Sequence, residues 1–174
     1  MTSRLDQPEH LAPHLDANAA TWREILGIDA SALAFFGRIS ALSLGWAALQ
    51  REALSRLGIN YAELAVLGML RTSLPEQRRS PTDLRALIGQ SSAGMTRILD
   101  KLEGDGHLRR EDLEGDRRRV DIVLTPSGAE LAEKAVRAML AAEDAVLAPL
   151  ARERRTQVAG GLDALLGAFA ARRR

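Results

Sequence analysis

The chain has 174 residues, of which 46% are hydrophobic and 3% aromatic, and its formal net charge at pH 7 is +1. This length and composition predict one domain, or one elaborated domain, with a helical core, while the small net charge gives almost no support for a nucleic-acid partner. The absence of cysteine excludes disulfides, zinc-thiolate sites and thiol-based oxidant sensing. We expect a cytoplasmic protein, since no apolar run approaches the roughly 18 residues of a membrane helix and no secretion signal is visible.

The first 58 residues predict a loose start followed by two helices. Pro8 and Pro13 disfavour regular structure at the beginning, and a short packed helix follows within residues 1–28. A long helix is predicted from about residue 30 to residue 57, where Gly58 ends it, and its Ala- and Leu-rich surface is wide enough for a partner. The apolar positions of the two helices are Trp22, Ile25 and Leu26, then Leu33, Phe36, Ile39, Leu42, Trp46, Leu49 and Leu54.

Capping residues mark the next three helices. Asn60 and Glu63 have capping-box spacing and predict a helix from Tyr61 to about residue 71. Ser80 precedes Pro81 and predicts a second helix that ends near Gly89. Ser91 is the natural cap of a third helix, so the last two helices form a helix-turn-helix. The expected buried residues of the three helices are Leu64, Leu67, Gly68 and Leu70; Leu84, Leu87 and Ile88; and Met95, Ile98, Leu99 and Leu102.

The free face of the third helix suits DNA recognition. Small side chains near its start, such as Ala93, would let the backbone enter a major groove, where Arg97 can reach a guanine edge or a phosphate. Gly94 is a poor helix former, and close approach to DNA would explain it. The exposed positions are Ala93, Gly94, Thr96, Arg97, Asp100 and Lys101.

A β-hairpin is predicted after this helix, with strands at Leu108–Glu111 and Val120–Leu124. The connection from Asp112 to Arg119 is longer than a usual hairpin loop of about two to five residues, and it carries Arg117, Arg118 and Arg119. Between Arg97 and Arg119 positive and negative side chains balance, so a basic surface requires the acids to be paired or turned away. The tip is therefore a candidate for contact with the minor groove or with phosphates, although solvated surface charge is the alternative.

Two long helices are predicted at the C-terminal end. Thr125 caps the first, which runs from Pro126 to about residue 147, and the second covers about residues 152–170. Their apolar faces fit either an intrachain bundle or a dimer interface, and we favour dimerisation. Residues 172–174 form a basic tail that we expect to be disordered.

Three segments of the chain resemble the multiple antibiotic resistance regulator (MarR) family. They are INYAELAVLGMLR, SSAGMTRILDKLEGDGHLRR and DRRRVDIVLTPSG, in which an aspartate-x-arginine pair is followed by leucine-threonine-x-x-glycine. The resemblance covers roughly residues 31–171. It implies a mainly α fold with a small β-hairpin wing, in which a winged helix-turn-helix lobe is joined to a helical dimerisation lobe. The implied division is an extension at 1–28, a dimerisation region at 29–58 and 126–171, a DNA-binding region at 59–125, and a tail at 172–174.

The resemblance also implies roles for individual residues. Base contacts in the major groove are expected from Ser92, Ala93, Thr96 and Arg97. Wing contacts in the minor groove are expected from Asp116, Arg117 and Arg118, with the acid positioning Arg118. Phosphate contacts are expected from Thr82, Gln90, Ser91 and Arg119.

The implied function is a ligand-responsive transcriptional regulator, predicted to be a repressor, that binds an inverted-repeat site in double-stranded DNA as a homodimer. An aromatic or phenolic acid is the expected effector, near Trp22, Arg38, Trp46 and Tyr61. No cofactor or metal is expected, because His10, His14 and His107 form no convincing ligand cluster, and a metal-responsive regulator is a weak alternative. No catalytic constellation is visible, so we do not expect an enzyme. A winged-helix adaptor that does not bind DNA remains the serious alternative.

Overall fold

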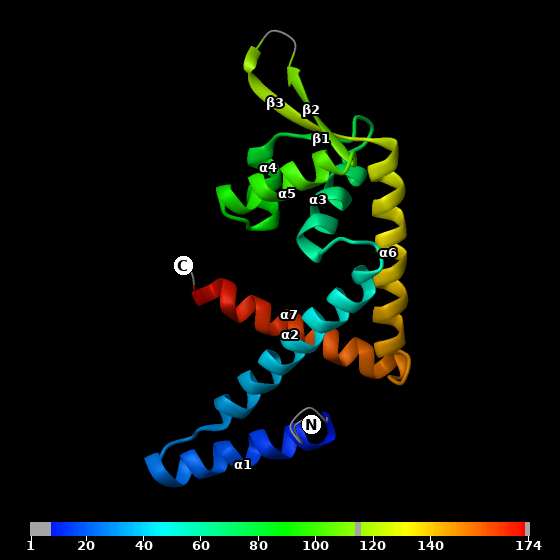
Figure 1. The fold of residues 1–174 in the computed structure, drawn as a ribbon. Helices are drawn as coiled ribbons and strands as arrows, with labels where there is room; N and C mark the ends of the chain where they lie inside the picture. The colour runs from blue at the N-terminus through cyan, green and yellow to red at the C-terminus, as the bar shows by residue number, and fades with distance from the viewer. Residues whose placement is uncertain (1–7, 114–115, 173–174) are drawn as a thin grey trace. The chain divides into compact units, whose positions relative to one another are not determined.

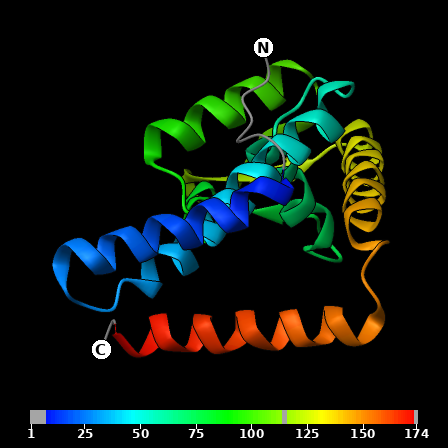
Figure 2. The ribbon, with the colours of Figure 1, turned by 90° about the horizontal axis from the view of Figure 1, so that it is seen from below.

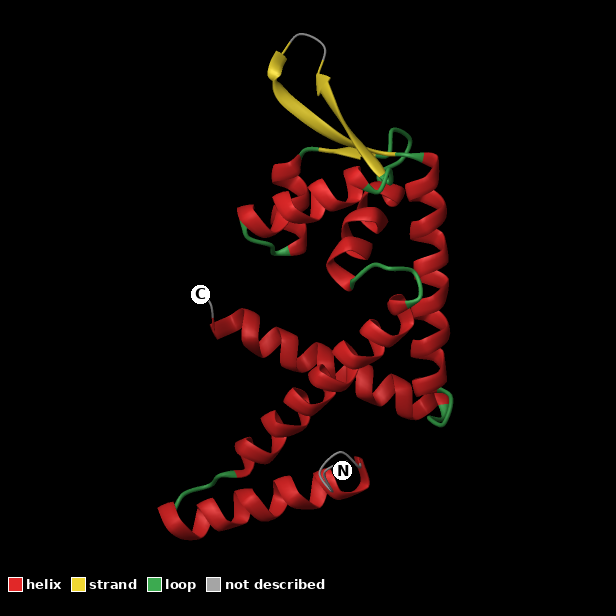
Figure 3. Ribbon diagram, in the orientation of Figure 1, coloured by secondary structure: helices red, strands yellow, loops and turns green. Residues whose placement is uncertain are grey.

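The computed structural model describes the backbone of residues 8–113 and 116–172 and the side chains of residues 11–112 and 120–172. Figures 1 and 3 show a mainly helical chain with a small sheet, which confirms the expected fold class. The chain divides into two compact units, Met1–Leu49 and Gln50–Arg174. In chain order the elements are α1 (Pro8–Leu26), α2 (Ser31–Ser55), α3 (Tyr61–Thr72), β1 (Arg78–Arg79), α4 (Pro81–Ile88), α5 (Ser92–Gly104), β2 (Leu108–Leu113), β3 (Asp116–Leu124), α6 (Pro126–Leu147) and α7 (Arg152–Arg172).

The helices of the second unit begin where their capping residues predict. Asn60 and Glu63 form a complete capping box at the start of α3. The side chains of Ser80, Ser91 and Thr125 each accept a hydrogen bond from the backbone N–H three residues later. Each cap supplies a partner for an N–H that the helix itself cannot satisfy, so local sequence determines these boundaries.

One apolar core holds the second unit together. It collects the predicted inner faces of α3 and α5 and adds residues from the sheet and from α6. Leu87 on α4 is exposed, so its predicted place in the core is wrong, and Gly68 is only half-buried. The fully buried large side chains are Leu54, Val66, Leu67, Leu70, Leu84, Leu102, Leu108 and Ile122.

The sheet has three antiparallel strands in the order β1-β3-β2, one more than predicted. Arg78 pairs with Val123 and Arg79 with Ile122, so this two-residue strand depends on a partner more than 40 positions away. The predicted loop from Asp112 to Arg119 is wrong, because β2 continues to Leu113 and β3 already begins at Asp116. The register shifts between Asp112 and Leu113, which pair with Val120 and Asp116, respectively. A long, irregular hairpin therefore replaces short strands with a long tip (Figure 3).

The first unit contains α1 and the first part of α2. α1 begins at Pro8 with Pro13 inside it and has 19 residues, so the prediction of irregular structure at these two prolines and of a short helix is wrong, whereas residues 1–7 lie outside the described residues. Trp22, Ile25 and Leu26 are exposed rather than packed, whereas Ala19 is buried. At Gly37 a β-carbon would lie 2.6 Å from the Leu15 side chain. Small residues, rather than the predicted large ones, bring the two helices of this unit together.

α2 is the most apolar long helix among the described residues. Its length and composition are sufficient to cross a membrane, with a mean hydropathy of 1.5 over an 18-residue window, only 6% of which is buried. The expectation that no apolar run approaches this length is therefore wrong. Such a composition is also typical of a helix that packs against partners on several sides.

Candidate nucleic-acid interface

α4 and α5 form the predicted helix-turn-helix within the second unit (Figure 1). Gly89 ends α4 with φ of 71°, a left-handed conformation in which glycine carries no side-chain penalty. Ser91 then caps α5 two residues later, and its Oγ accepts a hydrogen bond from Gly94 N at 3.1 Å. The turn between the two helices is therefore only three residues long.

The two faces of α5 separate as the sequence predicts. Met95, Leu99 and Leu102 are buried against the core. The four residues expected to contact bases, Ser92, Ala93, Thr96 and Arg97, are all exposed. The Thr96 hydroxyl donates to Ser92 O at 3.0 Å, which leaves the lone pairs of its oxygen available to accept a hydrogen bond.

Gly94 has an intramolecular explanation as well as the predicted one. A β-carbon at this position would lie 3.0 Å from Gln90 Oε1 and 3.1 Å from Ser91 Oγ. The side chains of the turn thus lie over the first turn of α5, and a larger residue would require the Gln90 and Ser91 side chains to shift.

The residues expected to contact phosphates differ in exposure. Thr82 and Ser91 are exposed, and Gln90 is half-buried. The side chain of Arg119 lies outside the described residues, as do those of Asp116, Arg117 and Arg118. Their backbones belong to β3 rather than to a loop, and their expected contacts stay predictions.

Many cationic side chains near α5 are paired with acids, which agrees with the predicted charge balance. Arg110 on β2 pairs with Asp100 at 2.6 Å and also with Glu103, so it ties the hairpin to α5. Arg109 donates to Glu111 Oε1 at 2.6 Å. Among the described side chains no carboxylate pairs with Arg97. Its guanidinium is therefore the available positive charge on the exposed face of this helix.

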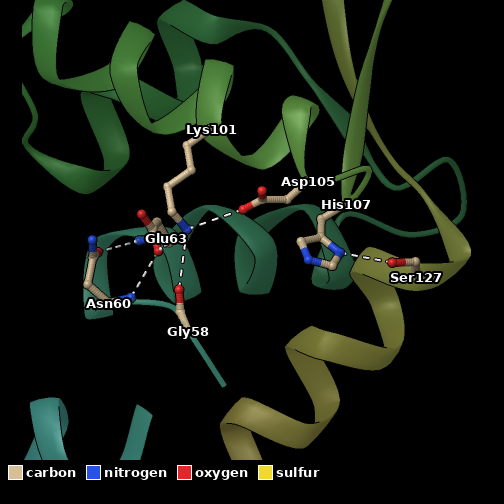
Figure 4. Close-up of polar contacts among 7 residues, drawn as sticks. All are labelled: Gly58, Asn60, Glu63, Lys101, Asp105, His107 and Ser127. Carbon is tan, nitrogen blue, oxygen red and sulfur yellow. Dashed lines mark hydrogen bonds and ion pairs between the residues drawn. The ribbon is translucent and has the colours of Figure 1, made fainter. Parts of the chain in front are cut away.

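Lys101 is exposed, as expected, and its side chain reaches the oxygen atoms of the cluster shown in Figure 4. Its Nζ lies 3.2 Å from Glu63 Oε2, 3.3 Å from Gly58 O and 3.3 Å from Asp105 Oδ2. Partial burial lowers the pKa of Lys101, but hydrogen bonds and charges from Glu63 and Asp105 raise it by more, so the net shift is upward. The sequence placed Lys101 on the exposed face and gave no signal for this cluster.

The segment Leu124-Thr125-x-x-Gly128 builds the corner between the hairpin and α6. Thr125 Oγ1 donates to Gly106 O at 2.9 Å and accepts from Gly128 N at 3.0 Å. Nearby, His107 Nδ1 lies 2.8 Å from Ser127 Oγ (Figure 4). One hydroxyl therefore closes the turn before β2 and caps α6, which fixes the base of the hairpin.

The residues expected around an effector are not brought together as a set. Arg38 lines a hollow of about 630 Å³ within the first unit, whereas Trp22 and Trp46 do not line it and Tyr61 belongs to the second unit. All three aromatic side chains are exposed.

The hollow contains charged residues that the sequence reasoning missed. Arg38 Nη2 donates to Asp16 Oδ2 at 2.8 Å, and Arg23, Asp29 and Phe35 also line the hollow. The hydrogen bond from Arg38 lowers the pKa of Asp16. Asp16 and Arg38 are 22 positions apart, so only the packing of α1 on α2 brings them together.

Comparison with known proteins gives consistent results. Residues 57–119 match the MarR family profile. The HTH-type transcriptional regulator PecS of Dickeya dadantii (strain 3937) is 31% identical over 147 residues, which cover 84% of this chain and 86% of PecS. The crystal structure of transcriptional regulator PA3341 is 26% identical, with a TM-score of 0.64, and covers 79% of this chain and 98% of that one. A mutant MarR from E. coli complexed with operator DNA is 24% identical, with a TM-score of 0.65, over 83% of this chain and 97% of that one.

Proposed function

The chain belongs to the MarR family of transcriptional regulators, and we propose that it is a repressor that binds an inverted-repeat DNA site as a homodimer and responds to a small ligand. The observation that carries the proposal is the exposed face of α5. It presents Ser92, Ala93, Thr96 and Arg97, which pairs with no carboxylate among the described side chains, next to a hairpin with further arginines. A cytoplasmic regulator that is not an enzyme follows from this assignment.

α5 has the properties of a helix that enters a major groove. Its first turn is small and polar, so the backbone can approach base edges, and Arg97 has the donors that recognise guanine. Asp116 and Arg118 would act at the hairpin, with the acid orienting the arginine toward the minor groove. Since many neighbouring cations are neutralised, we expect modest affinity with strong salt dependence.

A homodimer is supported by the surface of α7. None of the 21 residues of this helix, all of them described, is buried. Val158, Leu162 and Leu166 recur every four residues, which gives one exposed apolar face (Figure 2 shows the unbroken helix). A second copy of the chain would cover such a face, and two-fold symmetry would place two α5 helices about 34 Å apart on successive major grooves.

Ligand response is supported by the hollow in the first unit. Its volume lies within the usual range of small-molecule sites, and Phe35 beside Arg23 and Arg38 suits an aromatic carboxylate. We propose an aromatic or phenolic acid as the ligand of this hollow. To change DNA binding from mostly competent to mostly incompetent, the ligand would need about 5.5 kcal/mol of differential affinity between the two states.

The DNA-binding proposal is tested by selecting a site from random duplex DNA with the purified protein and footprinting it. We expect an inverted repeat whose affinity falls steeply with salt concentration. Arg118→Ala should weaken binding by about 1–3 kcal/mol. If the protein shows no sequence preference, or if Arg118→Ala leaves its binding properties unchanged, the result would favour a winged-helix adaptor that does not bind DNA.

The ligand-response proposal is tested by measuring the melting temperature of the protein with a series of phenolic acids. If none of them stabilises the protein, this class of ligand is rejected.

A further inference from the structure

Three oxygen atoms from three parts of the second unit converge on the ammonium group of Lys101 (Figure 4). Gly58 O belongs to the connection between α2 and α3, Glu63 Oε2 to the first turn of α3, and Asp105 Oδ2 to the end of α5 itself. An ammonium group has three N–H donors, so each of the three oxygens can receive one. Lys101 therefore joins the end of α5 to the point where α2 passes into α3.

One of the two acidic partners of Lys101 is almost completely buried. Glu63 is 4% exposed, and the same Oε2 also accepts the Asn60 N–H at 2.9 Å to close the capping box. A buried carboxylate needs its charge and lone pairs satisfied, and Lys101 supplies the positive charge. The contact therefore joins a buried carboxylate to an ammonium group whose side chain is 41% exposed.

The residue type matches this geometry. Lys101 is one of only two lysines in a chain with 24 basic residues. A guanidinium is planar and presents its donors in a fixed fork, whereas an ammonium can serve three oxygens that converge from different directions. Gly58, with φ of 68°, sits in a left-handed turn that directs its carbonyl oxygen to the same point.

We propose that Lys101 is a positioning residue for DNA recognition, which holds the recognition helix α5 at a fixed direction relative to the α2–α3 joint. The inference rests on the proposed DNA-binding function. In a dimer the direction of each α5 sets the distance between the two recognition helices. Lys101 therefore determines how strictly the protein selects the spacing of its half-sites, without contacting DNA.

The experiment compares Lys101→Met, Lys101→Arg and the double variant Glu63→Gln/Lys101→Met on the site that the wild-type protein selects. The double variant removes the buried charge together with its partner and keeps a capping-box residue at position 63, so it tests the inference even if Lys101→Met folds poorly. Lys134→Met is the matched control, because the pairing of Lys134 with described side chains stays within α6, with Glu130 at 3.6 Å.

All three Lys101 variants are expected to bind the site about tenfold more weakly than wild type at temperatures where they remain folded. The dependence of log affinity on log salt should keep the wild-type slope, since no phosphate contact is lost. The variants should also discriminate less against sites whose half-sites are moved apart by one base pair.

Three outcomes would overturn the inference. Affinity within twofold of wild type, with only a lower melting temperature, shows a purely structural role. If Lys101→Met reduces the slope of log affinity against log salt concentration by about one, while Lys101→Arg binds as tightly as wild type, Lys101 contacts a phosphate. A wild-type protein that binds no DNA overturns the proposed function and this inference together, whereas the first two outcomes leave the proposed function intact.

Discussion

The carbonyl oxygen of His107 lies so close to Gly128 that a β-carbon at position 128 would stand 1.9 Å from it. The same β-carbon would be 2.8 Å from the Leu124 side chain. The first turn of α6 thus packs directly on the backbone that leads into β2. This contact fixes the hairpin relative to α6 and explains why glycine closes the leucine-threonine-x-x-glycine segment.

We predict that Gly128→Ala lowers the free energy of unfolding by at least about 1 kcal/mol, because a backbone atom must move to admit the methyl group. Urea unfolding followed by circular dichroism measures the change. Gly68→Ala is the control, since a β-carbon there meets nothing within 4 Å and alanine favours the helix. Equal stability of Gly128→Ala and wild type would contradict the packing at this corner.

The contrast between helix starts and strand positions shows what the sequence predicts well. Asn60, Ser80, Ser91 and Thr125 mark helix starts because a cap needs only a side chain and an N–H a few residues later. β1 was missed because two arginines have no strand pattern of their own and are held by a distant strand. Local chemistry is readable in sequence, whereas pairing between distant segments is not.

The same contrast between local pattern and distant contacts applies to the candidate site. The exposed face of α5 follows from helical periodicity alone, so its four predicted residues lie where expected. The partners of Lys101 and Arg38, at Glu63 and Asp16, are separated from them by 38 and 22 positions and depend on how helices pack. The exposure of Trp22 and Trp46 also contradicts simple periodicity, which assumes that every apolar face is covered within its own chain.

Replacement of Arg97 tests the recognition helix. Arg97→Ala should weaken binding to the selected site by about 1–3 kcal/mol and relax the base preference at one position per half-site. Fluorescence anisotropy on a panel of single-base variants measures both effects. Arg137→Ala on α6 serves as a control for the loss of one positive charge. A uniform loss on all sequences, with a salt slope smaller by about one, would instead assign Arg97 to a phosphate.

The apolar face of α7 makes the dimer testable. Leu162→Asp places a charge in the centre of the row formed with Val158 and Leu166, and burying that charge in an interface is costly. We expect a monomer by light scattering coupled to gel filtration. Ala164→Asp adds the same charge on the opposite side of the helix and should leave the dimer unchanged. If Leu162→Asp and wild type have the same mass, the interface lies elsewhere.

The Arg71–Glu133 ion pair predicts a pH dependence of stability. Arg71 Nη2 and Nε donate to Glu133 Oε1 at 2.8 and 3.1 Å, which joins α3 to α6, and these hydrogen bonds lower the pKa of Glu133 below its ordinary value of 4.5. A carboxyl group with a lowered pKa in the folded state stabilises the fold fully above the unfolded-state pKa, and this contribution is lost as the pH falls through the folded-state pKa.

Glu133→Gln should therefore be less stable than wild type at neutral pH, and the difference should shrink as the pH falls below about 4.5. Because both side chains are partly exposed, high salt should reduce it as well. Chemical unfolding over a pH series measures the difference, and Arg71→Met should show the same dependence. A difference that stays constant down to acid pH would mean that lost packing, rather than the charge of Glu133, causes the destabilisation.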